Sequence, residues 1–276
     1  EYGKDLRFAQ YDVFLTVGLN IGTPHSPIPD CGIEWRRALP PVVPEFWARI
    51  GARAAPADGP FTTVASWGGY ADLSFRGEWY RTKYDEFRHF ADLPRRAGQP
   101  CEVLLKSVRE HDDGVSLLRE GGWVVRTAPG TLDLTAYRDY LARSRAEIGI
   151  TKGAYAKGRS GWFSDRTASY LAGGRPALVQ STGFEWRLPT GAGLVTFMDA
   201  EEAVAGVESI NRNYPAHCRA AREFAAAYLD YRKVLPGMLD ACGSLPARAP
   251  VALPDLRGEP TVSSHERTAI GLTEEA

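Results

Sequence analysis

The chain has 276 residues, a formal net charge of -1 and 44% hydrophobic residues. This length suits one large domain or two ordinary ones, and the near-neutral charge argues against nucleic acid as a partner, so that any anion site must be local. No apolar run approaches the length of a membrane span, so we predict a protein without a membrane span and with a cytoplasmic location.

The first part of the chain, residues 1–50, contains one β-rich run and a proline-rich link. Residues 11–17 predict a strand, and a lone strand needs a sheet in which to bury itself. We expect the other strands of that sheet to belong to an amino-terminal region that precedes the given sequence. Prolines between residues 40 and 44 predict a stiff, extended crossing between two domains.

Strands and helices alternate between residues 60 and 243. Apolar runs predict strands at residues 61–65, 101–105, 123–126, 148–150, 177–180 and 193–197. Helical periodicity and capping residues predict helices at residues 83–91, 112–120, 133–148, 163–171, 199–210 and 215–239. This alternation predicts an α/β fold with a doubly wound, mainly parallel Rossmann-like sheet. Residues 244–276, which are rich in charges and prolines, are predicted to be poorly ordered.

The chain is organised around the βαβ unit at residues 147–184. Between its first strand and its helix lies a glycine-rich loop, followed by the amino-terminus of the helix near residue 163. A helix amino-terminus offers unpaired N–H groups and partial positive charge, so the unit predicts a phosphate site there. Four cations could supply counter-charge: Lys152, Lys157, Arg159 and Arg166. The alternative is an ordinary βα turn that glycines and cations merely decorate.

Other chemical motifs are missing from the sequence. It has no dinucleotide fingerprint, no P-loop and no Gly-x-Ser-x-Gly elbow. The four cysteines and five histidines lie far apart and show no metal-ligand spacing, so we predict reduced thiols and no metal site.

At residues 161–184 the sequence GWFSDRTASYLAGGRPALVQSTGF resembles the donor-binding segment of two-domain GT-B glycosyltransferases, in which a similar glycine loop, helix, Gly-x-Pro turn and strand hold a nucleotide sugar. A narrower resemblance, to bacterial glycosyltransferase-like proteins of family-1 type, rests on the motifs TVGLNIG, CGIEWRRALPPVV, TKYDEF, SRAEIGITKGAY and GWFSDR. The resemblance covers roughly residues 8–240.

The resemblance implies a GT-B donor domain at residues 60–243, preceded at residues 1–50 by the end of an acceptor domain and the interdomain link. The implied donor-binding residues are Ser66, Trp67, Gly68, Lys83, Lys152, Ser160, Gly161, Trp162, Asp165, Arg166, Ser169, Thr182 and Gly183. Plainer alternatives are turn, capping, core or solvated roles; Asp165, for example, could only cap the helix. The chain departs from the family pattern at Ser169, where many retaining members have a ribose-binding glutamate, and at Ser181, where an aspartate is expected.

The implied reaction is transfer of a sugar from a nucleotide-diphosphate donor to an unidentified acceptor, with no tightly bound cofactor. A general base would come from the amino-terminal domain, and His25 is the candidate within this sequence. Ser169 and Ser181 also motivate a different class, a catalytically silent nucleotide-sugar-binding or scaffold protein. A third reading is a nucleotide-sugar epimerase of the same fold.

Overall fold

The computed structural model describes residues 7–51, 55–56, 58–66, 72–106, 113–127 and 133–243. The chain divides into two compact units, Glu1–Gly243 and Ser244–Ala276. The predicted tail at residues 244–276 and two predicted donor-binding residues, Trp67 and Gly68, lie outside the described residues. In the part of the chain that is described, no helix combines the length and the apolar character needed to cross a membrane.

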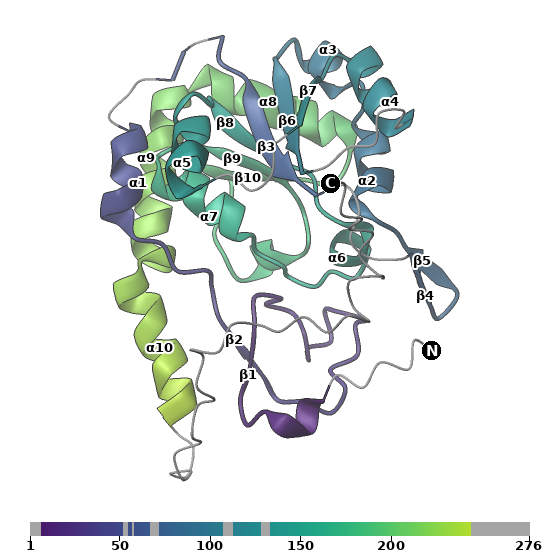
Figure 1. The fold of residues 1–276 in the computed structure, drawn as a ribbon, viewed down its shortest axis with the longest axis vertical. Helices are drawn as coiled ribbons and strands as arrows, with labels where there is room; N and C mark the ends of the chain where they lie inside the picture. Colours follow the sequence, from purple (N-terminus) through teal and green to yellow (C-terminus); the bar gives the residue numbers. More distant parts are fainter. Residues whose placement is uncertain are drawn as a thin grey trace, which may run out of the picture. The chain divides into compact units, whose positions relative to one another are not determined.

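A six-stranded parallel sheet is the centre of the first unit (Figure 1). Its strands are β3 (Phe61–Ala65), β6 (Cys101–Leu105), β7 (Val124–Thr127), β8 (Ala146–Gly149), β9 (Ala177–Gln180) and β10 (Leu194–Phe197). They lie in the order β10-β9-β8-β3-β6-β7, and every neighbouring pair is parallel. The predicted doubly wound, Rossmann-like fold class is therefore confirmed. The strand order reverses between β3 and β8, and this switch point is where open α/β sheets bind ligands.

Helices cover both faces of this sheet (Figure 1). They are α1 (Pro44–Gly51), α2 (Lys83–His89), α3 (Leu93–Ala97), α4 (Asp113–Gly121), α5 (Leu134–Ala142), α6 (Gly153–Lys157), α7 (Asp165–Ala172), α8 (Ala200–Arg212), α9 (Tyr214–Phe224) and α10 (Tyr231–Gly243). Leu104 belongs to an apolar cluster with α1, α5, α7 and α9, whereas Val103 and Leu105 belong to one with α2, α3, α4 and α8. Successive side chains of a strand point to opposite faces, so both faces of β6 are buried.

The remaining elements are short. They are η1 (Phe8–Gln10), β1 (Phe14–Thr16), β2 (Trp35–Arg37), β4 (Leu73–Phe75), β5 (Glu78–Tyr80), η2 (Phe184–Trp186) and a π-helical turn η3 (Ala225–Leu229). β1 pairs in parallel with β2, so the predicted first strand has a partner downstream, next to the proline-rich link. The region predicted as an extended crossing contains α1, which begins at Pro44 because a missing N–H costs nothing in the first helical turn.

The predicted helix at residues 133–148 is too long. α5 ends at Ala142 and β8 begins at Ala146, with Ile148 inside the strand. Leu134, the first residue of α5, is 57% exposed. The helix is predicted too long because only three residues separate α5 from β8. The apolar residues of the strand therefore continue the apolar pattern of the helix in the sequence.

Two further boundaries in the central βαβ unit differ from the prediction. The loop after β8 contains the short helix α6, and α7 begins at Asp165 instead of residue 163. The later start has a local cause. Ser164 is extended and its hydroxyl accepts a hydrogen bond from the Arg166 N–H, which makes it the N-cap of α7.

Gly121, at the end of α4, contacts the turn after α2 so closely that a side chain does not fit. A Cβ there would lie 1.7 Å from the carbonyl oxygen of Ala91. We expect Gly121→Ala to lower the free energy of unfolding by about 3 kcal/mol, because backbone atoms must move apart. Urea unfolding followed by circular dichroism measures the effect. Gly237→Ala in α10 is the matched control, since a Cβ there meets nothing within 4 Å; equal losses in the two variants would contradict the prediction.

Candidate functional site

A cavity of about 550 Å³ opens at the carboxyl end of β3, beside the switch point of the sheet. We call it the first cavity. α2 and α7 line it with polar groups that include Lys83, Asp165, Arg166 and Ser169. α1 and α5 line it with apolar and aromatic side chains. It therefore combines a charged wall with an apolar one, as ligand sites commonly do.

Two cations, Lys83 and Arg166, lie at the charged wall. Lys83 is only 8% exposed and lines the first cavity together with Arg166. Burial lowers the pKa of Lys83 to about 7, and the positive charges of Arg166 and Lys152 contribute to this shift, against the two carboxylates of Glu147 and Asp165. The first cavity is thus lined by two cations and by one carboxylate, that of Asp165. An anion in this cavity would supply the missing counter-charge.

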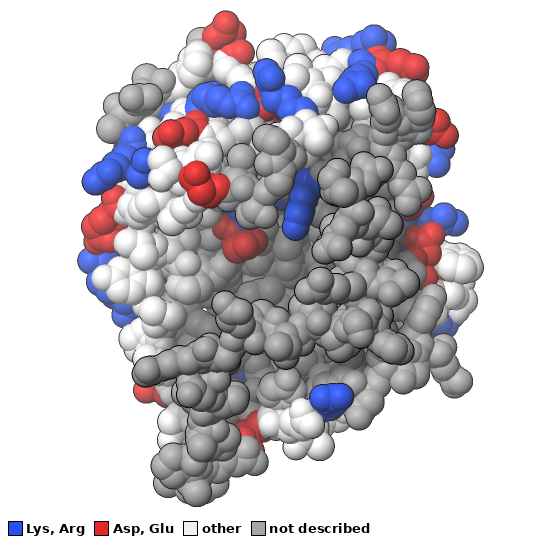
Figure 2. Space-filling model, in the orientation of Figure 1, with Lys and Arg blue, Asp and Glu red and all other residues white. Residues whose placement is uncertain are grey.

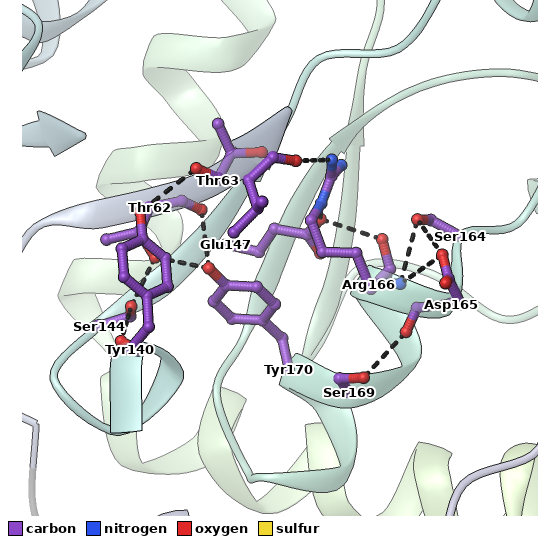
Figure 3. Close-up of polar contacts among 12 residues, drawn as sticks. Thr62, Thr63, Tyr140, Ser144, Glu147, Ser164, Asp165, Arg166, Ser169 and Tyr170 are labelled. Atoms are coloured by element: carbon purple, nitrogen blue, oxygen red, sulfur yellow. Dashed lines mark hydrogen bonds and ion pairs between the residues drawn. The ribbon is translucent and has the colours of Figure 1, made fainter. Parts of the chain in front are cut away.

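Arg166 is held in place by a buried ion pair (Figure 3). Its Nε lies 2.6 Å from Oε1 of Glu147 in β8, and Glu147 is fully buried. Its Nη1 donates to the carbonyl oxygen of Val64 in β3 at 2.9 Å. The same Glu147 oxygen accepts from the hydroxyl of Thr167, whereas Oε2 has no partner among the described residues. One guanidinium therefore joins α7 to both strands of the switch point.

The backbone amides before α7 are where the sequence predicts a phosphate site. The N–H groups of Gly161, Trp162 and Phe163 donate to the carbonyl of Thr182, the hydroxyl of Ser160 and the carbonyl of Val17, respectively. The amide of Arg166 is taken by the side chains of Ser164 and Asp165. These four amides already have acceptors within the protein, so a diphosphate that rested on them would have to displace those acceptors.

The glycine-rich loop is occupied by another part of the chain. The amides of Leu19 and Asn20 donate to the carbonyls of Gly161 and Ser160, and the Asn20 side chain donates to the carbonyls of Arg159 and Gly183. A Cβ at Gly161 would lie 2.7 Å from the Asn20 nitrogen, and one at Gly183 would lie 2.8 Å from its Nδ2. Both glycines also have positive φ angles. They make room for Asn20, which is completely buried.

The predicted donor-binding residues therefore separate into groups. The first cavity is lined by Lys83, Trp162, Asp165, Arg166 and Ser169. The contact region of Leu19 and Asn20 includes Ser160, Gly161, Thr182 and Gly183. Ser66 directly follows β3, and Lys152 precedes α6.

His25, the predicted base, is exposed. Its ring stands 4.8 Å from that of Trp186. The structure thus places His25 beside the 3-10 turn η2, and it is not part of the first cavity.

Sequence reasoning missed the burial of Lys83 and the role of Glu147. Lys83 opens an amphipathic helix, where a solvated lysine is equally expected. Glu147 did carry a signal, because it is a lone charge inside the apolar strand sequence AEIG. A carboxylate at such a position needs a buried partner, and Arg166 is that partner.

No protein-family model and no curated protein sequence matches the chain. Solved structures match its fold. AviGT4, a glycosyltransferase involved in avilamycin A biosynthesis, matches with a TM-score of 0.52 and 13% identity over 76% of this chain and 58% of that chain. Anabaena HepE in complex with UDP-glucose matches with a TM-score of 0.51 and 11% identity over 78% of this chain and 60% of that chain. S. aureus TarM, in a complex that contains UDP, matches with a TM-score of 0.52 and 11% identity over 77% and 40%.

The similarity shows the fold. These matches are GT-B glycosyltransferases, so the resemblance predicted from the sequence is confirmed at the level of architecture. The chain spans 40% to 60% of the length of the three structures described above.

Lys83 should make stability depend on pH. Its pKa is about 7 in the folded chain and 10.5 ordinarily, so between these values the unfolded chain holds a proton that the folded chain lacks. The free energy of unfolding then rises with pH in this window, and the cost of the buried charge is fully present below pH 7. Relative to Lys83→Met, the wild type should gain about 2 to 3 kcal/mol from pH 7 to 9. Urea unfolding at both pH values tests this, and parallel pH profiles would contradict it.

Glu147 should matter for folding far more than an exposed carboxylate. Glu147→Gln leaves Arg166 as a buried, unpaired charge, so we expect a loss of about 3 to 5 kcal/mol in the free energy of unfolding. Glu201→Gln is the matched control, because Glu201 pairs with Arg96 at 2.9 Å while its own side chain is 76% exposed. That change should cost less than about 1 kcal/mol. Chemical denaturation measures both, and a loss below 1 kcal/mol for Glu147→Gln would refute the role of the pair.

Proposed function

We propose that the first cavity binds the nucleotide-diphosphate part of a sugar donor and that the chain takes part in glycosyl transfer. The observation that supports this is that Lys83 and Arg166 line one cavity at the switch point of the sheet, with the charge of Lys152 near enough to lower the pKa of Lys83. On the face shown in Figure 2, positive and negative side chains are interspersed. The attraction for an anion therefore comes from this local group of cations, in keeping with a net charge of -1.

The apolar wall of the first cavity suits the nucleoside. Val43 and Leu134 are 47% and 57% exposed. Trp47 of α1 makes an edge-on contact with Tyr137 of α5. A planar base would cover this apolar surface. Ser169, which donates its hydroxyl proton to the carbonyl of Asp165, keeps an acceptor position for a ribose hydroxyl. One cavity thus offers separate surfaces for base, ribose and diphosphate.

The proposed reaction replaces one bond to the anomeric carbon by another. The acceptor oxygen forms the new glycosidic bond and gives its proton to a base, while the bond to the diphosphate breaks and the nucleoside diphosphate leaves with the electron pair. Negative charge grows on the leaving group, and the cations that face it stabilise that charge. Lys83 contributes most when protonated, which a bound anion favours.

A catalytically silent nucleotide-sugar-binding protein is the second candidate. It is favoured by Ser169 and Ser181 at positions where the family pattern has acids, and by the occupation of the glycine-rich loop by Asn20. Both candidates require donor binding. Release of free sugar from the donor, or its transfer to an acceptor, separates the enzyme from the silent protein.

We expect at least one of UDP, GDP, ADP and dTDP to bind the wild type in isothermal calorimetry. Lys83→Met should weaken binding at least tenfold, because it removes a charge that faces the diphosphate. At pH 8 the wild type should also take up a proton on binding, since Lys83 is mostly neutral in the free protein. Titrations in buffers of different ionisation heat measure this uptake.

Lys233→Met is the control for this experiment. Lys233 lies in α10 and donates to the carbonyl of Ala226, so its loss should leave nucleotide affinity unchanged. If none of the four nucleotides binds, or if Lys83→Met binds as tightly as the wild type, the proposed function is wrong.

A further inference from the structure

A second cavity, of about 820 Å³, opens at the carboxyl ends of β9 and β10. β5, α2, α6 and η2 contribute side chains to it. They include Tyr80, His89, Ser181, Glu185 and Trp186. None of these residues lines the first cavity, so the molecule has a second, distinct concave site.

Trp186 gives this cavity a fixed aromatic surface. The side chain is 47% exposed, although its ring contacts the ring of His25 at 4.8 Å and the guanidinium of Arg159 at 5.9 Å. The turn that presents it starts at Gly183, whose φ is +86° and where a Cβ would lie 3.0 Å from the indole. The indole is therefore held in one place while part of it faces outward. A held, half-exposed aromatic ring suits a ligand that has an apolar face.

Glu185 offers an unused acceptor at the same cavity. One carboxylate oxygen accepts from the hydroxyl of Ser181, whereas Oε2 is buried and has no hydrogen-bond partner among the described residues. A buried carboxylate oxygen without a donor is costly. Because solvent does not reach Oε2, the Glu185 side chain has to turn toward the cavity before a ligand hydroxyl can donate a hydrogen bond to it.

The charges that line this cavity disfavour an anionic ligand. Three carboxylates line it, from Glu78, Glu86 and Glu185. Its two cations already have partners, since Lys157 donates to the carbonyl of Trp79 at 3.2 Å and Arg159 lies against Trp186. This is the reverse of the first cavity, where cations exceed carboxylates. A neutral ligand with many hydroxyl groups and an apolar face fits all of these features.

The two cavities are neighbours along α2. Lys83 lines the first cavity, and Glu86 and His89 line the second. Residues three positions apart on a helix are separated by about 4.5 Å along its axis. The two cavities therefore border positions of α2 that are about one turn apart.

We propose that the second cavity binds a neutral saccharide. If the proposed function is correct, this saccharide is the acceptor, bound by the same chain that holds the donor. Trp186 contacts the apolar face of a sugar ring, and Glu185 accepts a hydrogen bond from one of its hydroxyl groups.

A glycan array printed with neutral and acidic saccharides tests this proposal directly. The wild type should bind neutral glycans, Trp186→Ala should lose at least tenfold in binding, and Glu185→Gln should lose less. Trp79→Ala is the matched control, because Trp79 is a similarly exposed tryptophan, at 51%, that does not line the second cavity. Its binding should equal that of the wild type.

Three results would contradict the proposal of a saccharide site. Binding to no glycan, binding to acidic glycans only, or equal losses in Trp186→Ala and Trp79→Ala would overturn the proposal. Titration of the same variants with UDP, GDP, ADP and dTDP keeps the two proposals apart. Intact nucleotide binding without glycan binding removes only the saccharide site, and glycan binding without nucleotide binding removes only the donor site.

Discussion

The buried pair of Glu147 and Arg166 is the interaction on which the first cavity depends. Glu147 belongs to β8, Arg166 belongs to α7, and the guanidinium also reaches the carbonyl of Val64 in β3. One side chain thus fixes the helix across the two strands between which the sheet order reverses. A buried pair gains little net stability over apolar contacts, because both charges lose water. The pair instead fixes the position of Arg166, because Glu147 holds the guanidinium at the edge of the first cavity.

The βαβ unit at residues 147–184 resembles the family pattern in sequence, but its glycine-rich loop makes different contacts from those that the pattern predicts. Glycines in such a loop are expected to let a ligand approach the backbone closely. Here the backbone of Leu19 and Asn20 approaches them instead. The amides of Gly161, Trp162 and Phe163 have acceptors on Thr182, Ser160 and Val17. Among the side chains that could recognise an anion is Lys83, whose pKa is lowered to about 7 by burial and by the positive charges of Arg166 and Lys152.

Much of the sheet could be predicted from sequence, because its strands are buried on both faces and form continuous apolar runs. β3, β6 and β9 have the predicted bounds for this reason. Helix ends were harder, since the start of α7 depends on the cap by Ser164. The filling of the glycine loop could not be predicted, because Asn20 and Gly183 are 163 residues apart in sequence. No local pattern records such a contact.

The two cavities differ in the charges that line them: cations exceed carboxylates in the first, and carboxylates exceed cations in the second. A diphosphate is bound best by positive charges that water does not screen. A neutral saccharide is bound by hydrogen-bond acceptors and by a flat apolar surface, and it needs no strong electrostatic field. α2 lies between these environments, with Lys83 on one cavity and Glu86 on the other. Glu86 accepts a hydrogen bond from Gln180 at 2.8 Å, which ties its side chain to the end of β9. The short helix thereby places a cation and a carboxylate about one turn apart, each at the edge of a different cavity.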